Sequence, residues 1–362
     1  MMDTALPWHA DTAAQWLSHR ERFAHAWLIH GMPGIGKRQF ALAAAAALLC
    51  EQPVNGLACG HCLACGWVSK GNHPDLRRIR PDAIAALEGS GDELSSEAKD
   101  ESSPPVSSDP SATGKKSLSK DIRIDQIRAV ENWFIQATHR GGYRVAVIYP
   151  AESLNVVSAN ALLKVLEEPV PNTVFLLVTD AMDRLMPTLI SRCRKLPLSA
   201  PSRAEAIAWL EQQGVDKADA WLSASGCAPV KALEMSREQP EACPPWLLEF
   251  AKNLSDGHTA EWGALSETLA KMSAVIWLDA LQRFIVDLNL LAHGSTARYY
   301  PSIQQATQSI AMRADPRRLS DLSSWINDQR RIAQHPLTPK LFAHAALDRF
   351  AAYCAHSNSL QA

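Results

Sequence analysis

The sequence lacks the features that would place the protein in a membrane, outside the cell or, by bulk charge, on nucleic acid. No uninterrupted apolar run reaches the about 18 residues that a membrane-spanning helix needs. Residues 1–11 contain neither the basic stretch nor the apolar core of a secretory signal. The formal net charge is only -2, so any contact with nucleic acid would need a local basic patch. We therefore expect a cytoplasmic protein.

A glycine-rich loop lacks one residue of its usual pattern. Residues 31–37 read GMPGIGK, but Arg38 stands where a phosphate-binding loop has Ser or Thr. The loop follows the strand-like run 26–30 and precedes the helix-forming run 41–49, which places a helix N-terminus at the phosphate. Arg38 cannot ligate Mg²⁺, so the loop keeps its anion cradle and loses its metal ligand. A chance glycine-rich turn is the alternative. The residues that would contact a nucleotide, weakly or not at all, are Gly31, Gly34, Gly36 and Lys37.

The acid that normally completes a P-loop magnesium site is also missing. The apolar run 145–148 should be a strand, and an Asp or Glu at its tip would hold the metal. Tyr149 and Pro150 occupy that tip instead. Glu152 follows in the turn into the next helix, where an acid more often serves the helix N-terminus. Two separate losses thus predict a nucleotide-binding domain that no longer hydrolyses.

Four of the eight cysteines are clustered directly after the expected loop helix. They are Cys50, Cys59, Cys62 and Cys65, in the pattern C-x8-C-x2-C-x2-C. In a reducing compartment such a cluster more often binds metal than forms disulfides. Four thiolates close a tetrahedral shell around one structural Zn²⁺, and Gly56, Gly60 and Gly66 would supply tight turns. His61 or His73 could instead replace Cys50, no metal could be held, and an iron–sulfur cluster would also accept these ligands.

Strand-like and helix-like segments alternate up to about residue 198, which predicts a mainly parallel sheet with helices on both faces. The expected strands are 26–30, 75–79, 145–149, 173–179 and 194–198. Residues 88–120 are rich in Ser, Pro and charge and nearly free of large apolar residues, which predicts a disordered insertion. After residue 200 only helices are expected. One carries Leu278, Leu281, Ile285 and Leu288 as a core-facing stripe.

Two downstream motifs carry a family resemblance. Residues 160–169 read NALLKVLEEP, and residues 191–193 read SRC. This order resembles the clamp-loader branch of the AAA+ ATPases, and the cysteine module resembles the bacterial replicative clamp loader in particular. The altered loop and missing acid favour a subunit that has lost hydrolysis over the gamma/tau subunit. The resemblance implies an α/β AAA+ domain at 1–200 with a zinc module at about 50–80, a helical lid at 201–243 and an all-α collar at 244–362.

The same resemblance implies a role and partners. The SRC arginine, Arg192, would reach across a subunit interface as an arginine finger in a neighbour's ATP site, and its guanidinium suits phosphate oxygens. The chain would have no activity of its own within the DNA polymerase III holoenzyme. Its partners would be gamma/tau and delta subunits, with the sliding clamp and primer-template DNA met through the complex.

Other interpretations remain open from the sequence. Arg192 could be a surface residue bonded to helix-end carbonyls, and Arg194 could be the finger instead. The chain could be a slow ATPase that uses Lys37 with Glu152 or Asp180 as the acid. It could also be a zinc-dependent DNA-binding module, since basic residues occur at 70, 77, 78 and 80.

Overall fold

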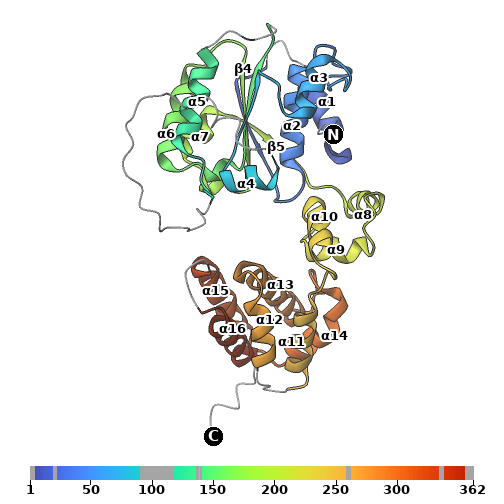
Figure 1. Ribbon diagram of the computed structural model, residues 1–362. Helices are drawn as coiled ribbons and strands as arrows, with labels where there is room; N and C mark the ends of the chain where they lie inside the picture. Colours follow the sequence, from blue (N-terminus) through green and yellow to red (C-terminus); the bar gives the residue numbers. More distant parts are fainter. Residues whose placement is uncertain are drawn as a thin grey trace, which may run out of the picture. The chain divides into compact units, whose positions relative to one another are not determined.

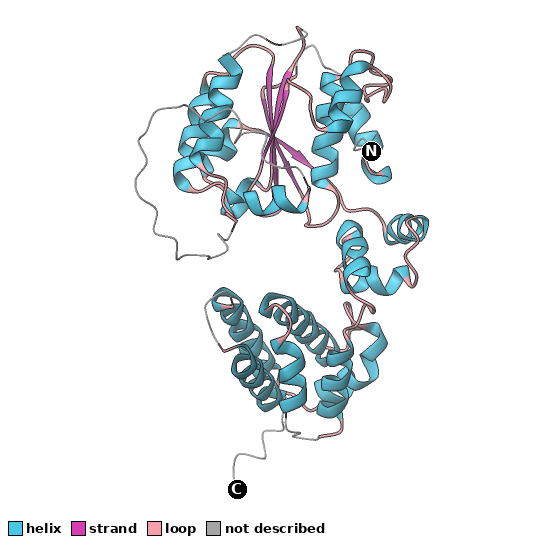
Figure 2. Ribbon diagram, viewed as in Figure 1, coloured by secondary structure: helices cyan, strands magenta, loops and turns pink. Residues whose placement is uncertain are grey.

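The computed structural model describes residues 5–18, 23–89, 118–135, 138, 141–257, 262–333 and 338–354. It divides into two compact units, Met1–Pro201 and Ser202–Ala362. The first is a sheet with helices on both faces, and the second consists of helices in its described part (Figures 1 and 2). Most of the insertion predicted at 88–120 lies outside the described residues. None of the described helices is both long and apolar enough to cross a bilayer.

The first unit is built on a five-stranded sheet with the order β2-β3-β4-β1-β5, in which every neighbouring pair is parallel. The strands are β1 (Ala26–His30), β2 (Leu76–Ile79), β3 (Arg144–Ile148), β4 (Thr173–Thr179) and β5 (Arg194–Pro197). All five expected strands are therefore present, with ends that shift by at most one residue. Together with the loop after β1, this parallel sheet confirms the predicted AAA+ type of P-loop domain.

Alternation along the buried strands divides the first unit into two cores, because successive strand residues point to opposite faces of a sheet. Ile29 and Val147 pack on the face covered by α2 (Lys37–Leu49). Leu28 and Ile148 pack on the opposite face, against α6 (Val156–Glu167). Figure 1 shows α1, α2 and α3 on one side of the sheet and α5, α6 and α7 on the other. The remaining helices of this unit are η1 (Pro7–His9), α1 (Ala10–Leu17), α3 (Leu63–Lys70), α4 (Asp82–Leu87), α5 (Ile124–Ile135), η3 (Ala151–Ser153), η4 (Met182–Arg184) and α7 (Pro187–Arg192).

The described part of the second unit is helical. Its elements are α8 (Arg203–Gln212), α9 (Ala218–Ala224), α10 (Pro229–Glu238), α11 (Pro245–Ser255), α12 (Gly263–Ala270), α13 (Ala274–Ala292), η5 (Pro301–Ile303), α14 (Gln304–Ala311), α15 (Pro316–Ile332) and α16 (Pro339–Cys354). One hydrophobic cluster runs from α8 to α16. The further division of this unit into lid and collar stays a prediction.

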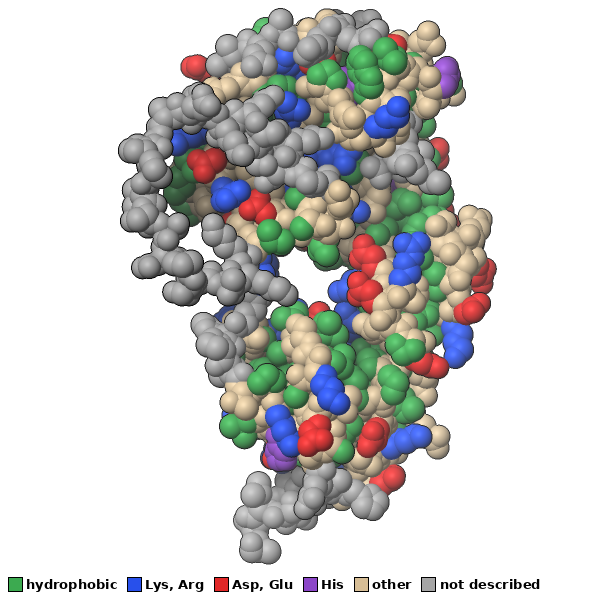
Figure 3. Space-filling view, viewed as in Figure 1, with side chains coloured by type: hydrophobic (Ala, Val, Ile, Leu, Met, Phe, Trp, Pro, Cys, Tyr) green, Lys and Arg blue, Asp and Glu red, His purple; other side chains and the backbone are tan. Residues whose placement is uncertain are grey.

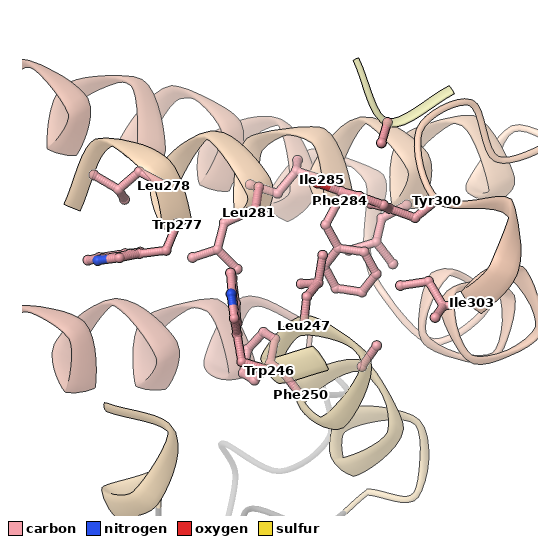
Figure 4. Packing of buried hydrophobic residues seen from close by; sticks show 14 of the residues in the cluster. Trp246, Leu247, Phe250, Trp277, Leu278, Leu281, Phe284, Ile285, Tyr300 and Ile303 are labelled. Atoms are coloured by element: carbon pink, nitrogen blue, oxygen red, sulfur yellow. The ribbon is translucent and has the colours of Figure 1, made fainter. Parts of the chain in front are cut away.

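Helix α13 is the centre of that cluster. The predicted stripe of Leu278, Leu281, Ile285 and Leu288 is fully buried, which confirms the core-facing helix. Figure 4 shows Leu281 and Phe284 of α13 directed toward α11, from which Trp246 and Phe250 extend toward them. Phe284 joins the stripe and stacks on Phe350 of α16, with ring centroids 5.6 Å apart.

We expect Phe284→Ala to lower the free energy of unfolding by about 3–5 kcal/mol, because it removes a stacked ring and leaves a cavity. Ile276→Ala, on the exposed side of the same helix, should change it by less than about 0.5 kcal/mol. Chemical denaturation of the purified chain measures both changes. Equal effects of the two substitutions would contradict the packing described for α13.

Candidate functional site: a neutralised phosphate loop and a cysteine cluster

The glycine-rich loop connects β1 to α2, as predicted, and its glycines are sterically required. A Cβ atom at Gly31 would lie 2.5 Å from the backbone oxygen of Leu198, so only glycine fits there. Gly34 and Gly36 have φ of 73° and 96°, in the left-handed region that favours glycine. Gly36 is the N-cap of α2, which leaves the first N–H groups of this helix facing the loop. The loop thus has the backbone form of an anion cradle.

The lysine of the loop is engaged within the chain. Lys37 is 3% exposed, and its Nζ donates to the Gly31 carbonyl at 2.8 Å and also to the Met32 carbonyl. The same ammonium pairs with Asp180 Oδ1 at 2.5 Å, where Asp180 directly follows β4. The positive charge that would meet a nucleotide phosphate is therefore balanced by a carboxylate of this chain.

The arginine that replaces the hydroxyl residue is balanced in the same way. Arg38 Nη1 lies 2.8 Å from Glu88 Oε1, and the other oxygen of Glu88 forms an ion pair with Arg80, 2.8 Å from its Nε. The Tyr149 hydroxyl donates to the same carboxylate, at 2.8 Å from Oε2 and 3.1 Å from Oε1. Arg38 and Tyr149 are the two residues that stand where metal ligands are missing, and Glu88 joins them.

Sequence reasoning missed Glu88, which it assigned to the disordered insertion. The residue is instead the C-cap of α4 and is only 18% exposed. Periodicity carries no signal for such a contact. Arg38 gives no indication either, because its side chain is 42% exposed and a solvent-exposed arginine does not require a carboxylate partner.

The two acids proposed for a slow ATPase have other contacts. Asp180 pairs with Lys37, and Glu152 Oε1 accepts the Asp180 backbone N–H at 3.1 Å. Glu152 lies in η3, the short helical turn that begins directly after Pro150, as the sequence suggested. Asp180 is thus engaged by the loop lysine, and one oxygen of Glu152 is engaged by the backbone that follows β4.

The four clustered cysteines come together as predicted. Their sulfur atoms all lie within 4.8 Å of one another, with Cys50 and Cys62 Sγ 3.9 Å apart and Cys59 and Cys65 Sγ 4.0 Å apart. A zinc ion with tetrahedral bonds of about 2.3 Å needs sulfur atoms about 3.8 Å apart. The donor set therefore fits a tetrahedral metal ion, with no open position for substrate.

Backbone N–H groups support the thiolates. They point to Cys50 Sγ from Cys59, to Cys59 Sγ from Cys62 and to Cys62 Sγ from Cys65, at 3.3–3.4 Å. Burial raises the pKa of the Cys62 thiol, but hydrogen bonds from the backbone of Cys65 and Glu51 outweigh this effect and lower the pKa to about 6. For Cys62 the low pKa favours the thiolate form that metals bind, whereas burial raises the pKa of the Cys50 and Cys65 thiols.

Neither alternative histidine joins the cluster. His61 is exposed and its Nδ1 is 2.9 Å from the Cys59 carbonyl. His73 is buried and its Nδ1 accepts the Asp75 N–H at 3.1 Å. Gly56 and Gly60 have the positive φ that tight turns require, but Gly66 lies inside α3. The prediction of a turn at Gly66 was wrong, because this residue continues the helix that positions Cys65.

Arg192 is the last residue of α7 and is 35% exposed. Its Nη1 donates to the Thr188 carbonyl at 3.0 Å, and its guanidinium also pairs with Glu167 at the end of α6. The neighbouring Arg194 lies on β5, with its guanidinium 6.0 Å from the Trp27 ring. The two arginines are thus close in sequence but have different contacts. Arg192 pairs with Glu167 of the LEEP motif, and Arg194 lies against an aromatic ring.

The basic residues suggested for DNA binding are partly engaged elsewhere. Arg80 pairs with Glu88, and the Arg77 guanidinium lies 5.3 Å from the centre of the Trp133 ring. In Figure 3, the Lys and Arg side chains of the described residues on the visible face are interspersed with Asp and Glu. Nothing in these contacts favours a dedicated DNA-binding face on this strand.

Fold and site together define a AAA+ P-loop domain whose loop keeps its glycines and lysine but not its metal ligands. The sequence profile of the family described as DNA polymerase III, delta subunit, matches residues 12–202, more than half of the chain. The chain therefore belongs to this family. The clamp-loader resemblance of the NALLK-x-LEEP and SRC motifs is confirmed, and the relatives below are delta-prime subunits.

Several curated relatives carry the name DNA polymerase III subunit delta', and two of them illustrate the similarity. The protein of Pseudomonas aeruginosa is 35% identical over 230 residues, which is 62% of this chain and 60% of the relative. The protein of Escherichia coli K12 is 28% identical over 299 residues, 82% of this chain and 78% of the relative. The match thus spans under two thirds of the first relative. Among solved structures, a gamma subunit-related protein of Thermotoga maritima aligns over 95% of this chain and 99% of its own, at 15% identity and a TM-score of 0.45.

We expect one zinc ion per purified chain, and Cys62→Ser should lower both the metal content and the midpoint of thermal unfolding because it opens the shell. His61→Ala is the matched control and should keep full metal content. Elemental analysis and thermal melts check both. A Cys62→Ser protein with unchanged zinc and unchanged stability would rule out this ligand set.

Proposed function

We propose that the chain acts as a non-hydrolysing delta-prime subunit of a replicative clamp loader. It would help to assemble a pentamer with gamma/tau and delta subunits, in the cytoplasm, and so load a sliding clamp onto primed DNA. Membership of the DNA polymerase III delta family supports the assignment. The observation that carries the loss of hydrolysis is the internal pairing of both loop cations, Lys37 with Asp180 and Arg38 with Glu88.

This pairing explains why the loop would not turn over ATP. Magnesium and a nucleotide would have to displace two carboxylates, and neither a hydroxyl at position 38 nor an acid at the tip of β3 would then hold the metal. A slow ATPase is less well supported, because Asp180 and Glu152 are bonded to Lys37 and to the Asp180 backbone. The loop would serve as a rigid support for α2 and the cysteine module.

Arg192 would act on a neighbour's ATP. Its partial exposure and its partner Glu167, itself 49% exposed, describe a guanidinium held at the surface by an exchangeable carboxylate. Exposed ion pairs of this kind contribute little stability, so phosphate oxygens could replace Glu167 readily. Arginine fingers supplied from another chain typically accelerate hydrolysis by about 10³–10⁵. The C-terminal helices, within residues 244–362, would supply the chain's share of the collar.

The isolated chain should hydrolyse ATP no faster than a buffer blank, since Arg38 and Tyr149 stand in place of the metal ligands. A phosphate-release assay with Lys37→Ala as the paired control measures this. Turnover in the wild type that disappears in Lys37→Ala would instead establish the slow ATPase.

In the mixed complex with gamma/tau and delta, Arg192→Ala should assemble normally and reduce DNA- and clamp-stimulated ATPase. The loss should be partial, because other subunits would complete the remaining sites with their own arginines. Arg192→Lys should rescue poorly, as an ammonium cannot form the bidentate contact. Arg194→Ala is the neighbouring control and should leave the rate unchanged. An Arg192→Ala complex that loads clamps at the wild-type rate would remove the finger role.

A further inference from the structure

Three side chains from different elements converge on the carboxylate of Glu88. Arg38 comes from the first turn of α2, Arg80 directly follows β2, and Tyr149 directly follows β3. These are carboxyl ends of neighbouring parallel strands and the start of the loop helix, the edge at which P-loop domains hold ligands. Where a divalent cation would need oxygen ligands, this chain presents two guanidinium groups and a hydroxyl donor. The site therefore carries positive groups that suit an anion, in place of the oxygen ligands that suit a cation.

Two of the three groups that contact Glu88, namely Arg80 and Tyr149, are buried in the first unit. Arg80 is 9% exposed and Tyr149 is 3% exposed. Arg80 is fixed further by a hydrogen bond from its Nη1 to the Arg78 carbonyl at 3.2 Å. Burial raises the pKa of the Tyr149 phenol well above its usual range, so the hydroxyl keeps its proton and acts as a donor. Only Arg38 is open to solvent, at 42%.

Glu88, by contrast, receives little support from its own helix. Glu88 ends the short helix α4, which has no fully buried residue. A carboxylate at a helix C-terminus is unfavourable for the helix, because that end carries the negative pole of the dipole. Its partners, and not its own helix, thus hold Glu88 in place. Two arginines and a phenol that hold a carboxylate from a separate short helix form the arrangement of an anion site filled by an internal ligand.

We propose that Arg38, Arg80 and the Tyr149 hydroxyl form a phosphate-binding site that works without a divalent cation, and that Glu88 is its internal competitor. The guanidinium groups of the two arginines match the oxygens of a phosphate group and can balance negative charge that magnesium would otherwise balance, while the Tyr149 hydroxyl donates a hydrogen bond. The ligand class is a phosphate or a phosphate ester such as a nucleotide. This site goes beyond the proposed function and does not depend on it, since it is a property of the isolated chain.

The test titrates inorganic pyrophosphate into the isolated full-length protein by calorimetry, in EDTA and at constant ionic strength. Glu88→Gln should bind at least tenfold more tightly than the wild type, because the competing charge is gone. The matched control is Asp82→Asn, which removes a carboxylate of the same 18% exposure that also pairs with an arginine, Arg123. It should bind like the wild type. Adding Arg38→Ala to Glu88→Gln should abolish the gain.

Stability provides a second readout that does not require a fully stable variant. Removing Glu88 leaves two cations without their counter-charge, so Glu88→Gln should melt below the wild type in chloride. Pyrophosphate should raise its melting temperature more than that of the wild type, because a ligand of the folded state stabilises it. Glu88→Asp, which keeps the charge on a shorter side chain, should fall between the two proteins.

Clear outcomes overturn the proposal. They are a folded Glu88→Gln protein that binds pyrophosphate no more tightly than the wild type, a gain that survives Arg38→Ala, or a gain that appears only with Mg²⁺. Titration with ADP separates the sources of the phosphate: tighter binding than pyrophosphate assigns a nucleotide, and equal binding assigns a free phosphate. Since no other subunit is present, failure here leaves the clamp-loader assignment untouched, and failure of complex assembly leaves this site untouched.

Discussion

The pairing of the loop's cations with carboxylates of the same chain is the constraint around which the first unit is organised. Lys37 is almost fully buried, and a buried ammonium is stable only with a partner close by. Asp180 supplies that partner from the end of β4, while Glu88 serves Arg38 from the end of α4. These contacts tie the loop to two neighbouring elements. Carboxylates of the same chain thus occupy the positions around the loop cations that a phosphate would take in a nucleotide-binding loop.

The parallel sheet makes this possible. Because all five strands run in the same direction, the residues that follow them collect at one edge, and Arg80, Tyr149 and Asp180 all follow strands. Substitution at one of these positions therefore changes the chemistry of a site to which distant segments contribute. The same edge that can hold a metal and a nucleotide can be converted into an internal ion-pair network without altering the strands.

Much of the fold could be predicted from the sequence. Strands such as β1 and β4 are unbroken apolar runs, and the stripe on α13 repeats at helical spacing, so burial alone fixes them. The cysteine cluster was predictable because its ligands are close in the sequence and its spacing is restrictive. Glu88 was not predictable, because its partners come from three distant segments and its surroundings in the sequence are polar. Gly66 was misassigned because glycine marks turns only where φ is positive, and the sequence does not display φ.

The family match and the altered loop concern the same part of the chain. The family match covers residues 12–202, nearly all of the first unit, and in this chain that unit lacks both metal ligands. Arg192 lies at the end of α7, in contact with Glu167 of the adjacent motif, so the two family motifs touch in the folded chain. A subunit can thus lose its own site and still present a charged group at its surface.

We infer that magnesium does not strengthen nucleotide binding at this loop. Equilibrium binding of ATP to the wild-type isolated chain, measured once in EDTA and once in excess Mg²⁺, tests it most directly. We predict weak binding that magnesium does not tighten, because Arg38 and Tyr149 stand where the metal ligands would be and both loop cations are already paired. Binding that becomes at least tenfold tighter with magnesium would contradict it.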